Sequence, residues 1–317
     1  MAEKEIYKAI CQQSPDSVPV FMQCWWLDAV ADAWDVALTL KGDQVTGVWP
    51  YVIEEKLSIT MRRNPRLTPY MGPHVFYPPD IKEANKDSYE HEVIEQLMGF
   101  LPDADVWRLS QYPGLKQAGL FRHYGLKIGV HQTFLLSLDA PEDELFHNCK
   151  EQLRRNIKTA EKEIVIANEP TALPELYEFQ KATLFKKRVS QYHTLEQMQR
   201  LMEPCIANNS GALWVARKEG VIQAIIWNVW DAENSYYFIG AKNPLVDNYR
   251  AMSALLWHAI REAKKRGNHT FDLEGSMDPG VERFFRNFGA KRELYLILRK
   301  DSHWLWRLKN FLKREKV

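Results

Sequence analysis

Two acidic residues at the end of a short apolar segment are the side chains of this sequence best suited to chemistry. Asp272 and Glu274 alternate with apolar residues, so a strand would place both carboxylates on one face, about 7 Å apart. A carboxylate at the end of a buried strand can take a proton from an attacking amine, and Glu274 lies nearer that end. The alternative is a structural carboxylate that pairs with Arg283, Arg286 or an arginine of another domain.

The stretch from Ser235 to Arg299 contains the elements that must position these carboxylates. A strand, a helix and a strand of this length imply a parallel pair joined by a crossover. Ligands of such sheets bind beyond the strand ends, at helix N-termini. We therefore expect a cleft near Gly240–Arg250 and Glu274–Gly280. The predicted elements are, in order, strand Ser235–Gly240, helix about Tyr249–Arg266, strand Phe271–Glu274, helix about Pro279–Phe288 and strand Leu294–Arg299.

The start of the first predicted helix is a candidate donor site. Its free amides and positive dipole end suit a phosphate. Arg250 is a cation in the first turn, where it opposes the dipole, so it either faces a bound anion or pairs with Asp247. Backbone amides beside Gly240 would hold a carbonyl as negative charge develops. The candidate donor-binding residues are Gly240, Asn248, Tyr249, Arg250 and Ser253.

The second predicted helix offers one further cation. Arg286 could supply positive charge to a leaving phosphate or alkoxide, which makes it a third candidate catalytic residue beside Glu274 and Asp272. The alternative is a solvated arginine on the helix surface. Phe285, its neighbour, has no proton to give.

Short motifs in this stretch resemble the tandem GNAT proteins related to the Fem-type (FemAB-like) peptidoglycan aminoacyltransferases. Phe271–Ser276 and Phe284–Ala290 carry the resemblance, and the second is similar to the Fem "FKxxFG" and GNAT "YxxxGF" elements. Leu153–Lys162 is similar to the basic helix that opens the second domain of Fem-like proteins. The resemblance implies an acyltransferase that moves an acyl or aminoacyl group from acyl-CoA or aminoacyl-tRNA, bound as substrate rather than as a tight cofactor, to an amine of a small molecule or peptide.

Two positions depart from the family pattern. Phe285 stands where the Fem pattern has lysine and many GNAT enzymes have a general-acid tyrosine. Residues 246–253 contain no glycine, although acyl-CoA enzymes usually have a glycine-rich loop there. We therefore expect weaker CoA binding than in a glycine-loop enzyme. A GNAT scaffold that binds a peptide, sugar or cell-wall precursor without chemistry remains the alternative.

Four residues outside this stretch are candidate substrate contacts. Arg66, Tyr70 and His74 lie in a proline-rich loop, which the resemblance places toward the acceptor. His193 lies in a predicted loop and could act as a base near neutral pH, or be an inert loop histidine.

The two halves of the chain show a similar order of elements. A hairpin and a further strand are predicted in each half, over Val36–Met61 and over Leu213–Ile239. We predict a mixed α/β protein with two GNAT-like domains, each a mixed, mostly antiparallel sheet flanked by helices. The predicted domains are 1–138 and 139–300, followed by an amphipathic helix over 301–317. The alternative is two unrelated α/β domains.

Composition excludes several broad classes. The 317 residues carry a formal charge of +1, which gives no global attraction to nucleic acid. Four scattered cysteines show no metal-ligand spacing and predict reduced thiols and a cytoplasmic location. No run approaches the ~18 apolar residues of a membrane span.

Two amphipathic segments leave partners open. The predicted helix around Glu144–Glu163 carries Arg155, Lys158 and Lys162 on one face, which suits tRNA phosphates or solvent. The basic segment 303–317 suits either docking on its own protein or peripheral contact with a membrane.

Overall fold

The computed structural model describes residues 3–56, 58–246, 249–275 and 278–303. The chain divides into two compact units. The first contains Met1–His131 and the segment that starts at Leu294, and the second is Gln132–Glu293. In the described part of the chain, no helix is long and apolar enough to cross a membrane. The prediction of a mixed α/β fold is confirmed.

The first unit contains two sets of paired strands. Strands β1, β2 and β5 form one, and β3, β4, β6 and β13 lie in that order in the other. β4 and β6 pair in parallel, with α3 between them in the chain, and β6 pairs antiparallel with β13. The elements are α1 Glu3–Gln13, α2 Cys24–Val30, β1 Asp35–Lys41, β2 Gln44–Tyr51, β3 Ile53–Lys56, β4 Ile59–Arg63, β5 His74–Val75, α3 Glu83–Phe100, β6 Val106–Ser110, α4 Ala118–His123 and β13 Lys291–Asp301.

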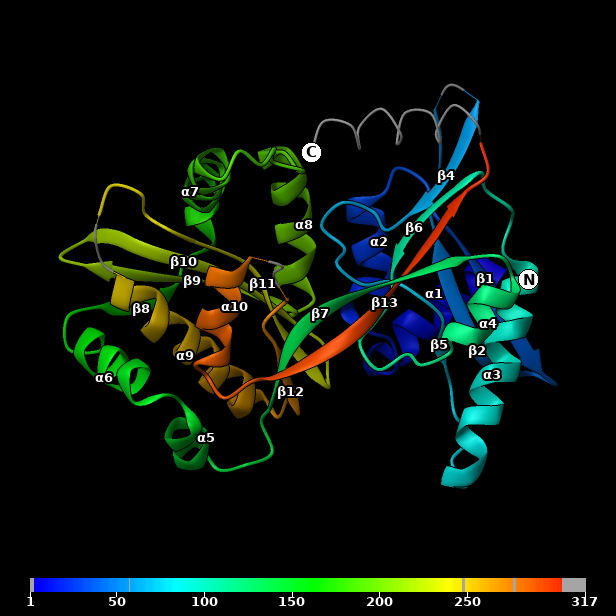
Figure 1. Ribbon diagram of the computed structural model, residues 1–317, viewed down its shortest axis with the longest axis horizontal. Coiled ribbons are helices and arrows are strands. Elements are labelled where there is room, and N and C mark those ends of the chain that lie inside the picture. Colours follow the sequence, from blue (N-terminus) through cyan, green and yellow to red (C-terminus); the bar gives the residue numbers. More distant parts are fainter. Residues whose placement is uncertain (1–2, 57, 247–248, 276–277, 304–317) are drawn as a thin grey trace. The chain divides into compact units, whose positions relative to one another are not determined.

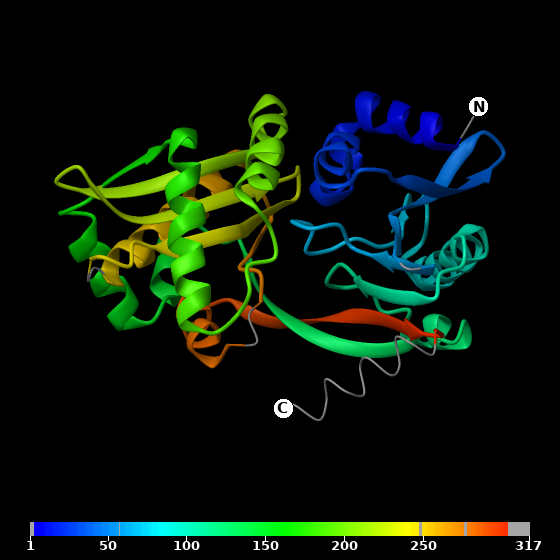
Figure 2. The same ribbon diagram turned by 90° about the horizontal axis from the view of Figure 1, so that it is seen from above.

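The strands of the second unit pair in the order β7-β12-β11-β10-β9-β8. Its helices cover both faces, with α7 and α8 on one side and α6 and α9 on the other (Figure 1, Figure 2). The elements are β7 Lys127–Ser137, α5 Glu142–Asn148, α6 Glu151–Ala160, β8 Val165–Asn168, α7 Leu173–Lys186, α8 Leu195–Ala207, β9 Gly211–Lys218, β10 Val221–Trp230, β11 Asn234–Lys242, α9 Tyr249–Arg266, β12 Thr270–Asp272 and α10 Pro279–Arg286.

Helix α9 forms the centre of the second core. Its apolar stripe, which includes Leu255, Leu256 and Ile260, has no solvent exposure and packs on the sheet. Burial of each such side chain stabilises the fold by about 1.5–3 kcal/mol. The stripe ends before Gly267, whose φ of 91° is the left-handed conformation that commonly ends a helix.

The two units do not divide the chain at a single point. β7 begins in the first unit, but its residues Leu135–Ser137 pair with β12 in the second. β13 begins in the second unit, and Ile297–Asp301 pair with β6 in the first. This division therefore differs from the predicted 1–138, 139–300 and 301–317. Asp301 ends β13, and the rest of the predicted C-terminal helix, from residue 304, lies outside the described residues.

The hairpins predicted in both halves exist, but their sheets differ. β9, β10 and β11 are consecutive neighbours in one sheet, whereas the first hairpin, β1–β2, pairs with β5 and is separate from β4. The expectation that Val36–Met61 and Leu213–Ile239 form equivalent sheet strands is therefore wrong in its pairing. Val52 lies between two separate strand pairings. β2, which pairs with β1, ends at Tyr51, and β3, which pairs with β4, begins at Ile53. What the units do share is a parallel pair with a helix between its strands, β4–α3–β6 and β11–α9–β12.

The segment predicted as one helix around Glu144–Glu163 forms two helices. α5 ends at Asn148 and α6 begins at Glu151. The amide of Lys150 donates to the carbonyl of Asn287, 2.8 Å away, and the Arg154 guanidinium donates to the carbonyl of Cys149 at 2.6 Å. These bonds satisfy backbone groups that a continuous helix would have paired internally.

Candidate functional site

The parallel strands β11 and β12 stay together for only three residue pairs. Asn234, Ser235 and Tyr236 lie opposite Thr270, Phe271 and Asp272. β12 ends there, while β11 continues to Lys242 along β10 (Figure 1). Beyond Tyr236, this edge of β11 has no strand partner in the described part of the chain.

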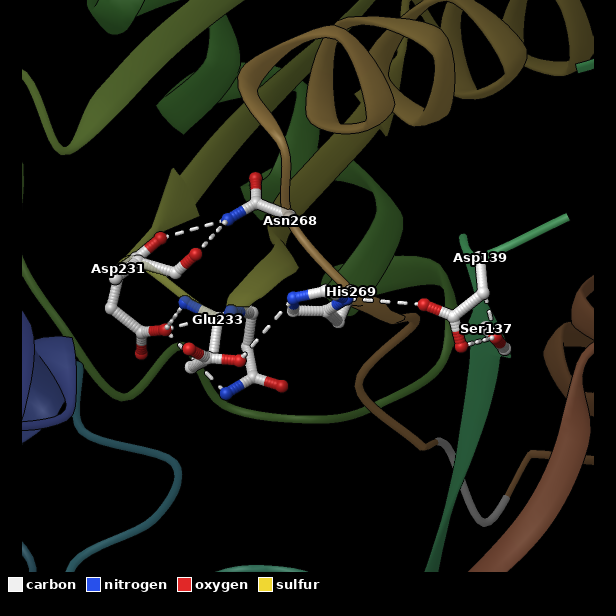
Figure 3. Close-up of polar contacts among 8 residues, drawn as sticks. Ser137, Asp139, Asp231, Glu233, Asn268 and His269 are labelled. Atoms are coloured by element: carbon white, nitrogen blue, oxygen red, sulfur yellow. Dashed lines mark hydrogen bonds and ion pairs between the residues drawn. The ribbon is translucent and has the colours of Figure 1, made fainter. Parts of the chain in front are cut away.

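The opposite end of the strand pair is held closed by polar contacts (Figure 3). The Asn268 side chain donates to the carbonyl of Asp231 at 2.8 Å, and the amide of His269 donates to the carbonyl of Glu233 at 2.8 Å. The His269 ring lies 3.1 Å from a carboxylate oxygen of Asp139. The two strands are therefore fixed at their N-terminal ends and part toward their C-terminal ends.

A cavity of about 420 Å³ lies where they part. Its interior is mostly apolar, and two exposed lysines, Lys150 and Lys242, lie in its wall. β11, α6, α7, α9 and α10 contribute the lining residues, which are Lys150, Gln152, Leu153, Asn156, Thr183, Tyr237, Gly240, Ala241, Lys242, Met252, Ser253, Gly280, Val281, Phe284, Phe285 and Asn287.

The two candidate carboxylates lie close together, but not on one strand face. Asp272 is the last residue of β12 and is buried, where it accepts hydrogen bonds from the Thr133 hydroxyl and, at 2.8 Å, from the amide of Glu274. Glu274 lies in the turn that follows, with a left-handed φ of 46°. The expectation of a strand through Glu274, with both side chains on one face, is therefore wrong.

The turn is set by a close approach of two backbone segments. The amide of Gly275 donates to the Thr133 hydroxyl at 2.9 Å. A Cβ at Gly275 would overlap the carbonyl oxygen of Gln132. Only glycine fits here, and the turn at Glu274 follows from this contact with β7.

Glu274 is a half-buried residue, and one of its carboxyl oxygens is buried and unsatisfied. Its Oε1 atom is buried and has no hydrogen-bond partner among the described residues. Burial, and secondly the charge of Asp272, raise the pKa of Glu274 well above its usual range. No ion pair joins it to Arg283 or Arg286 in the described part of the chain, so the structural alternative of an arginine partner lacks support.

Tyr237 is a cavity residue that sequence reasoning missed. Its ring meets Phe285 edge-on, with centroids 5.5 Å apart, and a Cβ on Gly240 would overlap its hydroxyl. Burial, with a smaller contribution from Glu274, raises the pKa of Tyr237. The phenol thus lies against the residue that replaces the family's tyrosine or lysine. Alternation along β11 gives only a weak signal for this, because the contact joins a strand to a helix 48 positions later in the sequence.

The predicted donor residues fall into three groups. Gly240 and Ser253 line the cavity. Asn248 lies outside the described residues, as do Asp247 and the side chain of Tyr249. Arg250 is in the first turn of α9 but does not line the cavity; after Lys218, it helps to lower the pKa of Glu163.

Arg286 matches the solvated alternative. Its side chain is 51% exposed, and its Nε lies 3.6 Å from a carboxylate oxygen of Glu282, one helical turn away. It is not among the residues that line the cavity.

Three of the predicted substrate contacts belong to the first unit. Arg66 is exposed, and Tyr70 is buried against aromatic rings, among them that of Tyr295. His74 Nε2 lies 2.8 Å from the carbonyl of Ser17, and burial lowers the pKa of its ring.

His193 belongs to the second unit. It is half-buried between α7 and α8, where its Nε2 lies 2.9 Å from the side-chain oxygen of Gln180.

Comparison with known proteins identifies the second unit. Residues 147–286 match the family model of the acetyltransferase (GNAT) domain. No curated protein matches the chain. The second unit therefore contains a GNAT domain, and the residues that line the cavity all belong to this unit.

Solved structures extend the likeness to the whole chain at the level of fold. FemX has 12% identity and a TM-score of 0.69, over 93% of this chain and 96% of its own. The C-terminal domain of a putative lysylphosphatidylglycerol synthetase from Agrobacterium fabrum has 11% identity and a TM-score of 0.53, over 98% and 96%. A tandem GNAT protein of the clavulanic acid pathway has 7% identity and a TM-score of 0.50, over 86% and 83%.

Proposed function

We propose that this GNAT acyltransferase, whose fold is related to that of FemX, transfers an acyl or aminoacyl group from acyl-CoA or aminoacyl-tRNA to an amine of a small molecule or peptide. The observation that carries the proposal is the cavity of about 420 Å³ where β11 and β12 part, with the first turn of α9 in its wall. Parallel sheets bind ligands at such strand ends. The four cysteines are free thiols, which supports a cytoplasmic reaction.

Glu274 is the proposed base. An alkylammonium with a pKa near 10.4 costs roughly 4.6 kcal/mol to deprotonate at pH 7. The raised pKa of Glu274 makes its ionised form a stronger base than an exposed glutamate. Asp272 acts by positioning, because it accepts the amide of Glu274 and holds the turn.

Two further groups of the cavity are assigned to the negative charges that develop on the carbonyl oxygen and on the leaving sulfur or oxygen. Peptide groups of β11 around Gly240, where the strand has no partner on its other edge among the described residues, are proposed to hold the carbonyl oxygen as it becomes negative. The Tyr237 phenol is proposed to give its proton to the leaving sulfur or oxygen as the new C–N bond forms and the C–S or C–O bond breaks. Tyr237 would thus be the proton donor, a role that Phe285 cannot perform because it has no acidic proton.

The donor's phosphates are proposed to lie beside Lys150 and Lys242. Both side chains are exposed members of the cavity wall, and Ser253 adds a hydroxyl from the first turn of α9. Two cations and a helix start attract phosphate without a glycine-rich loop.

The test is a charge reversal of these lysines. We expect the double variant Lys150→Glu with Lys242→Glu to lose on the order of tenfold in affinity for the donor at low salt, because each change replaces attraction by repulsion. Calorimetry with acetyl-CoA and with a short 3′-aminoacyl RNA measures the loss and tells the two donors apart. The control is Lys41→Glu with Lys116→Glu, two exposed lysines of the first unit.

If neither probe binds the parent protein, the transfer reaction proposed here is wrong, and a binding module becomes the better interpretation. Equal losses of donor affinity in the double variant and in its control would show that the donor phosphates do not bind beside Lys150 and Lys242.

A further inference from the structure

The end of α7 and the connection to α8 expose an unusual amount of aromatic surface. The side chains of Phe185 and Tyr192 are 82% and 71% exposed, and Val189 is 39% exposed. We call residues 185–192 the aromatic–basic loop; it consists of the last two residues of α7 and most of the connection to α8 (Figure 1). Exposed aromatic residues grouped in this way indicate an interaction surface.

The backbone holds these side chains outward. The amide of Arg188 donates to the carbonyl of Phe185, and that of Val189 to the carbonyl of Leu184, each at 3.0 Å. This pair of bonds is the Schellman helix end, and it needs a left-handed residue, here Arg188 with a φ of 56°. Glycine would adopt this φ with less strain. The backbone conformation therefore does not account for the arginine at this position.

The loop also carries three consecutive cations, Lys186, Lys187 and Arg188. Lys187 pairs at 2.6 Å with Asp278, the N-cap residue of α10. The other two are exposed and have no carboxylate partner in the described part of the chain. One cation therefore fixes the loop, and two remain for a partner of negative charge.

The loop adjoins the cavity on two sides. Thr183, two residues before Phe185, lines the cavity from α7. Asp278 starts α10, whose residues Gly280 and Val281 line it as well. A surface bound by the loop would lie beside the cavity of the second unit.

We propose that the aromatic–basic loop docks on an anionic lipid bilayer. Aromatic rings settle at the headgroup level of a bilayer, and lysines and arginines pair with anionic headgroups. An unpaired RNA strand would also use rings and cations, but it gains little from aliphatic Val189, which a bilayer buries. One further step rests on the proposed function: the acceptor amine would then belong to a molecule held at the membrane surface.

The experiment is sedimentation of the full chain with vesicles. We expect binding to vesicles of phosphatidylcholine and phosphatidylglycerol in equal amounts, weak binding to phosphatidylcholine alone, and a loss of binding with salt. Phe185→Ser with Tyr192→Ser should weaken binding on the order of tenfold or more, because two rings no longer enter the interface. Lys186→Glu with Arg188→Glu should weaken it by roughly fivefold or more per charge.

The matched controls replace exposed residues elsewhere in the second unit. Ile206→Ser with Val221→Ser removes two aliphatic side chains that are 47% and 50% exposed, and should leave binding unchanged. All changed side chains are exposed, so each variant should melt near the parent.

Three results would overturn the proposal. The first is equal sedimentation with anionic and neutral vesicles. The second is full binding by Phe185→Ser with Tyr192→Ser, which would assign vesicle binding to another surface. The third is loss of binding to an unpaired oligoribonucleotide in these variants with vesicle binding intact. Failure of acetyl-CoA or aminoacyl RNA to bind tests the transferase proposal separately, because vesicle binding needs no donor.

Discussion

Glu274 acquires its properties from its surroundings rather than from its type. An exposed glutamate is ionised at neutral pH, whereas this one lies in a turn with a buried oxygen that no described residue satisfies. Its folded-state pKa is raised, so the native protein retains the proton to a higher pH than the unfolded chain does. Stability therefore falls as pH rises above the unfolded value of about 4.3.

Glu274→Gln should remove this pH dependence. Glutamine keeps the shape of the protonated side chain and cannot ionise. We expect the melting temperature of the variant, relative to that of the parent, to increase from about pH 4.3 upward, with a slope of at most about 1.4 kcal/mol per pH unit in unfolding free energy. Thermal melts of both proteins at a series of pH values, from the unfolded value to neutrality and above, would measure this slope. Exposed Glu144→Gln is the control.

The same variant tests the proposed base. Loss of a general base costs roughly 10²–10⁴ in rate, and the loss should shrink at high pH, where more of the amine is neutral. A variant that is destabilised at every pH but transfers at the normal rate per folded molecule would refute the catalytic role and indicate a structural one.

At the scale of elements, the site depends on where strands β11 and β12 stop pairing. The polar contacts around His269 hold one end together. At the other end, Gly275 allows the backbone after β12 to lie against β7. The parting of the two strands therefore depends on two local backbone arrangements, and a single methyl group at Gly275 would disturb the second of them.

Gly275→Ala should destabilise the second unit. The new Cβ would overlap the carbonyl oxygen of Gln132, which is backbone and cannot rotate away. Overpacking of this kind costs typically about 1–3 kcal/mol, measurable by urea denaturation. Gly119→Ala is the matched control: it lies in helix α4 with open space around it, and should stabilise by about 0.5–1 kcal/mol. Equal effects of the two changes would contradict the close approach.

The sequence allowed the elements to be predicted where their causes are local. The apolar stripe before Gly267 is enough for α9, and its bounds are confirmed. The break between α5 and α6 could not be predicted, because it depends on a bond from Lys150 to Asn287. The turn at Glu274 and the place of Tyr237 were missed for the same reason: both follow from contacts between residues far apart in the sequence.

At the scale of the whole molecule, membership of a unit does not follow chain order. β7 completes the sheet of the second unit, and β13 completes that of the first. Sequence patterns indicate that a strand exists but not which sheet it joins, because an apolar strand pairs with any edge of suitable register. The predicted boundaries at 138 and 300 follow position in the chain, and they therefore place β7 in the first domain and most of β13 in the second.

Leu298→Ala tests whether β13 stabilises the first unit. Leu298 belongs to the last strand, is fully buried, and packs in the core of the first unit opposite Leu109. Truncation of a buried leucine costs about 2–5 kcal/mol. We expect hydrogen exchange to speed up in β6 and its neighbours of the first unit, although the mutated residue follows the whole second unit in the sequence. Leu294→Ala, in the same strand but 58% exposed, should change little. Faster exchange confined to β9–β12 would mean that β13 stabilises the second unit instead, and that chain order does define the units.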